Sequence, residues 1–248
     1  MILAQRAAAI ALAVMLLPIA ATAQSLACRP FTKDVIAAPE PREAAAPIKR
    51  FEGIRQALKV QPYRALYLGD SITQLWDPKI WQQNMAPRGV FNAGVSGDRT
   101  EHLLWRLDHG NLDGPPPKVA IVLIGTNDIG HGRLVEDAAE GIRAVLLKLR
   151  VREPATRIVL LGLWPRGASP TDPLRRKVVA VNDLIQTCGD DKSVFYADIG
   201  GVLTDSRGEL TRAISPDLLH FSAAGYARIA PLLDRLLDPL LAMPPLSG

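Results

Sequence analysis

The feature that most constrains this chain is an alternation of short apolar runs with segments of helical periodicity, which begins at Phe51. Such a series is typical of βαβ units, in which helices connect parallel strands. The run "VAIVLI" at 119–124 is apolar throughout, which predicts a central strand covered on both faces. The expected strands are 66–68, 90–93, 119–124, 157–161 and 194–196, with helices at 133–152, 173–187 and 223–241. We therefore predict an α/β fold: a three-layer α/β/α sandwich around a central parallel five-stranded sheet.

The N-terminal stretch predicts a separate targeting segment. Residues 1–23 contain one early cation, Arg6, then an apolar run and a small-residue Ala-Thr-Ala end before Gln24. This pattern favours a cleaved signal peptide and a secreted or periplasmic protein. The alternative is an uncleaved anchor, although the apolar run is shorter than the ~20 residues that a membrane span needs. Residues 24–50 are rich in Pro and Ala and are expected to form an extended lead-in to a folded domain at 51–243.

Charge and cysteine content limit the partners and the compartment. The formal net charge is +4, and the Lys and Arg residues are scattered rather than striped, so we expect no nucleic-acid partner. No second apolar run is long enough to suggest a membrane span in the mature chain. Cys28 and Cys188 can form a disulfide in an oxidising compartment, or they can remain two thiols.

Polar residues follow the expected strands where a parallel sheet binds its ligands, at the carboxyl ends of the strands. "GDS" at 69–71 follows the first strand, "NAGVSGDRT" at 92–100 follows the second and "GTND" at 125–128 follows the third. "SPDLLHFSAAGY" at 215–226 precedes the last helix. We expect these four segments to meet at one edge of the sheet.

Ser71 and His220 are the candidate nucleophile and base. A serine hydroxyl becomes a good nucleophile when a base takes its proton. Asp217 precedes His220 by three residues, close enough for its carboxylate to orient the imidazole. The structural alternatives are a helix cap for Ser71 or its neighbour and a surface position for the histidine. His131 is the rival base, and Ser96 is a second, less favoured hydroxyl.

Three groups are candidates for stabilising an oxyanion. They are the N–H of Ser71, the N–H of Gly97 and the side-chain amide of Asn127. Glycine lets the backbone approach a ligand closely, and the asparagine would follow a rigid central strand. The alternatives are a plain turn at the glycine and an Asx-turn or cap at the asparagine.

These blocks resemble the SGNH (GDSL-type) serine hydrolases. The family's serine, glycine, asparagine and histidine correspond to Ser71 in "GDSIT", Gly97 in "GVSGDRT", Asn127 in "GTND" and His220 in "DLLH", which also contains Asp217. "FNAGVSGDRTEHLLWRL" and "DLLHFSAAGYARI" are similar to the branch of the platelet-activating-factor acetylhydrolase catalytic subunits. The resemblance implies a flavodoxin-like sheet, short-acyl ester substrates, no metal or other cofactor, and a homodimer.

The resulting hypothesis is a secreted or periplasmic carboxylic-ester hydrolase with a Ser-His-Asp triad. Its substrate would be a small-molecule or glycan ester, with the acyl-bearing alcohol either a carbohydrate or a lipid. One alternative is a non-catalytic envelope binding protein on the same fold. A metal-dependent phosphoesterase is the other, because Asp, Asn and His are metal ligands, but the H-x-H and G-N-H clusters of such sites are missing.

Overall fold

The computed structural model describes residues 26–32 and 38–246. The expected signal peptide at 1–23 lies outside the described residues. Within the described part of the chain, no helix is both long enough and apolar enough to cross a bilayer.

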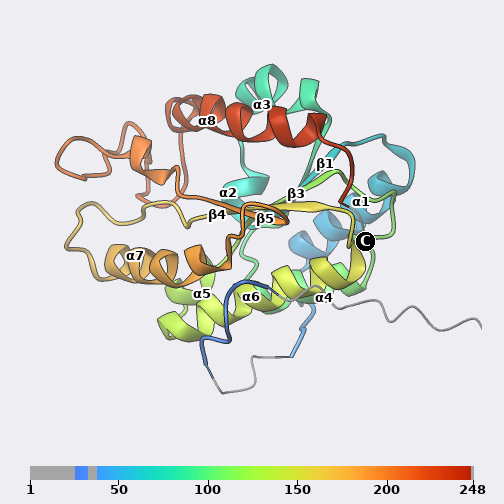
Figure 1. The fold of residues 1–248 in the computed structure, drawn as a ribbon. Coiled ribbons are helices and arrows are strands. Elements are labelled where there is room, and N and C mark those ends of the chain that lie inside the picture. Colours follow the sequence, from blue (N-terminus) through green and yellow to red (C-terminus); the bar gives the residue numbers. More distant parts are fainter. Residues whose placement is uncertain (1–25, 33–37, 247–248) are drawn as a thin grey trace, which may run out of the picture.

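A five-stranded sheet, parallel throughout, forms the centre of the molecule (Figure 1). Its strand order is β2-β1-β3-β4-β5, so β2 lies on one side of β1 and the later strands are added on the other side. The order of strand addition therefore reverses between β1 and β3. This is the flavodoxin-like order, in which ligands bind beside the reversal point. The fold-class prediction is confirmed. The strands are β1 (Ala65–Gly69), β2 (Val90–Gly94), β3 (Val119–Leu123), β4 (Arg157–Leu161) and β5 (Val194–Ala197).

Helices cover both faces of the sheet. In Figure 1, α8 and α3 lie above it, whereas α4, α5, α6 and α7 lie below. The three predicted helices are present, with ends shifted by at most two residues. The described α-helices are α1 (Ala45–Val60), α2 (Ser71–Gln74), α3 (Pro78–Asn84), α4 (Thr100–Asp108), α5 (Thr126–Gly130), α6 (Val135–Arg152), α7 (Pro173–Ile185) and α8 (Ala223–Ala242). Short 3₁₀ turns occur at Ala86–Arg88, Gln186–Cys188 and Gly200–Leu203.

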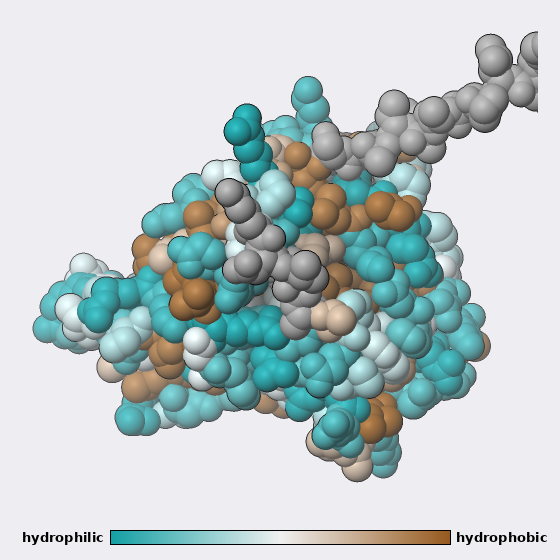
Figure 2. Space-filling model, turned by 90° about the horizontal axis from the view of Figure 1, so that it is seen from below, coloured by the Kyte–Doolittle hydropathy of each residue, from teal (hydrophilic) through white to brown (hydrophobic). Residues whose placement is uncertain are grey.

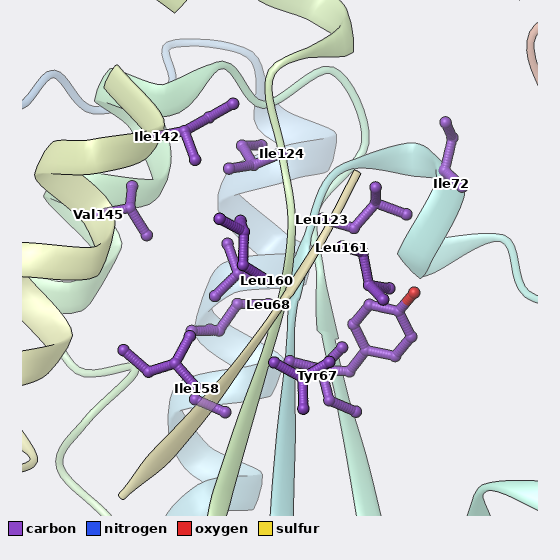
Figure 3. Packing of buried hydrophobic residues seen from close by; sticks show 14 of the residues in the cluster. Tyr67, Leu68, Ile72, Leu123, Ile124, Ile142, Val145, Ile158, Leu160 and Leu161 are labelled. Carbon is purple, nitrogen blue, oxygen red and sulfur yellow. The ribbon is translucent and has the colours of Figure 1, made fainter. Parts of the chain in front are cut away.

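The core fills both interfaces between the sheet and the helices. Every residue of β1, β3 and β4 is buried, as expected for strands covered on two faces. Successive side chains point to opposite faces, so Leu68 packs toward α6 while Tyr67 packs toward α2 (Figure 3). Viewed from below, the outer surface is mostly hydrophilic, with hydrophobic side chains in separate groups (Figure 2).

The expected extended lead-in through residue 50 is wrong at its C-terminal end, because α1 begins at Ala45. Alanine has the highest helix propensity, and Pro47 lies in the first turn, where its missing N–H would have no intrahelical partner. Phe51, Ile54 and Leu58 then recur at helical spacing and are buried. The ring of Phe51 contacts Trp105 of α4 edge-on, with ring centroids 5.2 Å apart.

A disulfide joins Cys28 to Cys188 at the end of the turn that follows α7. Of the two alternatives drawn from the sequence, the structure contains the paired form. The bond links positions 160 residues apart, and the chain-entropy model assigns such a loop roughly 4–5 kcal/mol of stabilisation. Three residues later, the N–H of Phe31 donates to Glu140 of α6 at 2.8 Å. The N-terminal segment is therefore attached to the helical layer below the sheet.

Candidate active site

The carboxyl ends of β2, β1 and β3 bring three of the polar segments to one edge. Because β1 lies between the other two strands, the residues after Gly69 are flanked by those after Gly94 and Leu123. The chain after β1 turns at once into α2, which lies against the end of β2. A Cβ on Gly94 would collide with the Gln74 N and Asp70 O atoms of that turn. Glycine is needed there for the close approach of the two segments.

Asp70, rather than Ser71, caps α2. Its carboxylate accepts the N–H of Ile72 at 2.9 Å, which is the interaction of an N-cap residue. Ser71 is the first residue of the helix, and only 6% of it is exposed. Asp70 is therefore the helix cap that the sequence allowed for Ser71 or its neighbour, and the Ser71 hydroxyl is available for another partner.

That partner is His220. Its Nε2 lies 2.8 Å from Ser71 Oγ, although the two residues are 149 positions apart in the chain. Its Nδ1 lies 2.6 Å from the Oδ2 atom of Asp217. A carboxylate oxygen can only accept, so Nδ1 carries the proton and Nε2 is free to accept the serine proton. The structure thus brings Ser71, His220 and Asp217 together in one hydrogen-bonded chain.

Local backbone geometry fixes the carboxylate of Asp217. Its Oδ1 accepts the N–H groups of Leu219 at 3.0 Å and His220 at 2.7 Å. Leu218 adopts a φ of 63°, in the left-handed region, which closes the turn. Burial acts to raise the pKa of Asp217, but the hydrogen bonds from the imidazole and these two N–H groups outweigh it and lower the pKa to about 2. The carboxylate is therefore ionised at neutral pH.

Tyr226 holds the histidine segment against the serine segment. Its hydroxyl donates to the carbonyl of Ile72 in α2 at 2.7 Å, and its ring stacks on Trp76 with centroids 4.6 Å apart. Ser215 Oγ also donates to the carbonyl of His220 at 2.7 Å. Tyr226 was not among the predicted site residues. The available signal was its position one helical turn into α8, four residues after the N-cap Ser222.

Gly97 lies in the loop after β2, and Asn127 lies in the first turn of α5 rather than in a loop, at the same edge of the sheet. Gly97 has a φ of 78°, which favours glycine, and the preceding N–H of Ser96 donates to Gln74 of α2 at 2.7 Å. The Asn127 amide donates to the carbonyl of Asp98 at 2.8 Å. A primary amide has two N–H groups, so one remains to bind a substrate oxygen. The glycine and the asparagine are thus linked through the loop at 97–98.

A buried ion pair fixes that loop from beneath. Arg106 of α4 donates to Asp98 Oδ2 at 2.7 Å, and the same guanidinium donates to the carbonyls of Ala93 and Gly69 at 3.1 and 3.2 Å. Both charged side chains are almost fully buried. Arg106 therefore satisfies backbone groups at the ends of two strands. An arginine on an apolar helix face was the one sign of this role in the sequence.

The remaining histidines contact groups other than Ser71 Oγ. His131 is exposed, and its Nδ1 lies 2.8 Å from the carbonyl of Asn127. His102 accepts the N–H of Arg99, and burial lowers its pKa to about 4. His109 stacks on Trp105. In the described residues, no group of three His, Cys, Asp or Glu side chains could hold a metal ion.

The comparison with known proteins agrees with this geometry. Residues 67–228 match the model of the GDSL-like Lipase/Acylhydrolase family. The chain belongs to this family. As a GDSL-like acylhydrolase, it is an esterase, and its blocks at 71, 97, 127 and 217–220 all lie inside the matched region.

Relatives of this acylhydrolase span most of its length. The platelet-activating factor acetylhydrolase IB subunit alpha2 of Rattus norvegicus is 38% identical over 182 residues, covering 73% of this chain and 78% of that protein. The alpha1 subunit of Homo sapiens is 39% identical, covering 71% and 76%. A solved structure from Streptococcus pneumonia, described as a platelet activating factor, has a TM-score of 0.69 at 26% identity, covering 77% and 92%. The chain is similar to all three.

Asp70 gives this acylhydrolase a pH-dependent stability. Burial is the main cause that raises its pKa to about 7, with the carboxylates of Asp98 and Asp128 adding to the effect. In the unfolded chain an aspartate titrates near pH ~4. Between these values the folded state binds more protons than the unfolded state, so this group lowers stability as pH rises from about 4 to 7.

We expect Asp70→Asn to remove this dependence, because the side chain of the variant does not titrate. Its amide oxygen can still accept the N–H of Ile72, so the helix cap is kept. The Tm of the variant minus that of the wild type should become more positive between pH 4.5 and pH 8, as measured by calorimetry. Asp183→Asn, at an exposed position, is the control and should give a flat difference. A flat difference for Asp70→Asn as well would contradict the raised pKa.

Proposed function

We propose that this enzyme hydrolyses short-acyl carboxylic esters with Ser71 as nucleophile, His220 as base and Asp217 as the group that orients it. The observation that carries the proposal is the unbroken hydrogen-bonded chain from Ser71 Oγ through the imidazole to the carboxylate. Its geometry is that of a serine-hydrolase triad. Membership of an acylhydrolase family supports the same chemistry.

In the proposed mechanism, Ser71 Oγ attacks the acyl carbonyl carbon and its proton passes to His220 Nε2. The ionised Asp217 stabilises the imidazolium that forms. The carbonyl oxygen becomes an oxyanion, and the N–H groups of Ser71, Gly97 and the Asn127 amide donate to it. His220 then gives its proton to the departing alcohol oxygen, which leaves an acyl-serine.

Hydrolysis of the acyl-serine follows the same route in reverse. Water replaces the alcohol, and His220 removes its proton while the water oxygen attacks the acyl carbon. The second tetrahedral intermediate collapses, the proton returns to Ser71 Oγ and the carboxylic acid is released. No cofactor enters either half of the reaction.

An acetyl group is the proposed acyl group. Two relatives near 38% identity are named acetylhydrolases, which supports a short chain. With p-nitrophenyl esters from acetate to dodecanoate, we expect kcat/KM to be highest for acetate and to fall at least tenfold by octanoate. A rise with chain length would contradict a short-acyl site.

Export is proposed from the leader at 1–23, with the mature chain beginning at Gln24. The disulfide between Cys28 and Cys188 supports an oxidising compartment. The mass of the protein recovered from the periplasm or medium should equal that of residues 24–248, and recovery of the full-length chain in the cytoplasmic fraction would contradict export. A homodimer stays a prediction of the family resemblance.

A further inference from the structure

A polar pocket of about 370 Å³ opens beside Gly97. Three segments line it: residues 40–44 before α1, the Gly97–Arg99 loop with the first turn of α4, and His131 after α5. Gly97 belongs to the loop packed on α2, and His131 contacts the carbonyl of Asn127. The pocket therefore adjoins two of the proposed oxyanion donors.

Arg42 fixes the first wall of this pocket to the site. Its guanidinium donates to the carbonyl of Gly97 and lies 3.8 Å from Asp98 Oδ1. The N–H of Glu40 donates to the carbonyl of Glu101 at 3.3 Å. This wall precedes the residues 67–228 that match the family model, so it is built by a part of the chain outside the matched region.

The hydrogen-bonding capacity of two histidines in the pocket follows from their contacts. His131 Nδ1 faces the carbonyl of Asn127, which can only accept, so Nδ1 carries a proton, and in the neutral ring Nε2 is an acceptor. His102 Nδ1 accepts the N–H of Arg99, so its Nε2–H is a donor. Burial lowers the pKa of His102 to about 4, which keeps this ring neutral at pH 7.

The charged side chains of the pocket balance one another. Its nine lining residues include Arg42 and Arg99 as well as Glu40 and Glu43, so the formal charge of the lining is zero with histidines neutral. Arg99 is also paired with Glu101. A phosphate group would meet no excess of positive charge here. The pocket instead offers donors and acceptors side by side.

The pocket is also poorly suited to hydrocarbon. Pro41 and Ala44 are the apolar side chains in its lining, and an alkyl chain laid across it would remove water from two guanidinium and two carboxylate groups. A hydroxyl group both donates and accepts, so several hydroxyls can satisfy this mixed set at once.

We infer that this pocket binds the alcohol portion of the ester and that this portion is a sugar. The inference rests on the proposed function, because it assigns the non-acyl part of the same substrate. With a short acyl group at Ser71, the rest of the substrate is the part that needs a second binding surface. His131 Nε2 accepts a sugar hydroxyl, while Arg42, Arg99 and the neutral His102 donate to others.

The test compares two acetyl esters, a mono-O-acetylated oligosaccharide and p-nitrophenyl acetate, whose alcohol carries no sugar hydroxyls. For His131→Ala, we expect the ratio of kcat/KM for the sugar ester to that for p-nitrophenyl acetate to fall at least tenfold, mainly through KM. His131→Gln, which keeps an acceptor oxygen, should recover part of this loss. The matched control is His109→Ala, since His109 Nδ1 also contacts a carbonyl four residues earlier, that of Trp105 at 2.7 Å, but lies outside the pocket.

A binding measurement separates the inference from the mechanism. Calorimetric titration of Ser71→Ala with the acetylated oligosaccharide should give a Kd that rises at least tenfold when His131→Ala is added. An unchanged ratio in His131→Ala, or an equal loss on an acetyl-glycerophospholipid, overturns the sugar pocket while the triad stands. If Ser71→Ala cleaves p-nitrophenyl acetate at a rate within tenfold of the wild type, the proposed function fails, and the inference fails with it.

Discussion

Replacing Ser71 with alanine should lower kcat for p-nitrophenyl acetate by a factor on the order of 10⁵–10⁶, because the proposed nucleophile is lost outright. The residual rate would come from the oxyanion donors and from substrate binding alone. The fold should tolerate the change, since Asp70 rather than Ser71 caps α2. Loss of one hydrogen bond to His220 should change the free energy of unfolding by about 0.5–1.5 kcal/mol.

The measurement is steady-state kinetics together with covalent labelling by a fluorophosphonate, which should modify the wild type at residue 71 and leave Ser71→Ala unmodified. Ser96→Ala is the control, because Ser96 lies in the neighbouring loop and contributes its backbone N–H, not its hydroxyl, to Gln74. It should retain full activity and full labelling. Activity of Ser71→Ala within tenfold of the wild type would remove Ser71 as the nucleophile.

Asn127→Ala should lower kcat by about 10²–10³-fold, which corresponds to about 2.7–4 kcal/mol of transition-state stabilisation. KM should change little, because the amide acts on charge that develops only as the tetrahedral intermediate forms. The same amide also donates to the carbonyl of Asp98, so the kinetics need a structural control. Tm measurements on each variant show whether loss of the hydrogen bond to Asp98 has destabilised the loop at 97–98.

Asn127→Asp is the matched variant, because the side chain keeps its size but loses its N–H donors, including the one to the carbonyl of Asp98. A carboxylate at this position would also repel the oxyanion, so the loss in kcat should equal or exceed that of the alanine variant. A decrease of less than threefold in Asn127→Ala would show that this residue does not stabilise the transition state.

The sheet could be predicted from the sequence because its signal is local. The strands are short apolar runs, and in the segments between them apolar residues recur at helical spacing. The type and order of the helices and strands therefore follow from the hydrophobic pattern alone. The start of α1 could not be predicted, because proline at position 47 is compatible with both an extended segment and a first helical turn. Packing of Ile54 and Leu58 against the core decides between the two.

Three of the site blocks were also predictable, because each follows a strand and all parallel strands end at the same edge, whereas the block at 217–220 precedes α8. The contacts that hold these blocks against one another could not be predicted. Tyr226 acts on α2 across 154 positions, and Arg42 reaches a backbone carbonyl 55 residues away. A contact to a backbone carbonyl requires no particular residue type at the partner position, so the sequence carries no mark of it.

The separation of 149 positions between hydroxyl and imidazole has a consequence for biosynthesis. A nascent chain leaving the ribosome at ~5–20 residues per second carries the serine for roughly 7–30 s before the histidine emerges. If Ser71 and His220 act as proposed, we expect no ester hydrolysis during that time. The proposed triad can form only when the segment before α8 reaches α2, so we expect activity to appear late in folding.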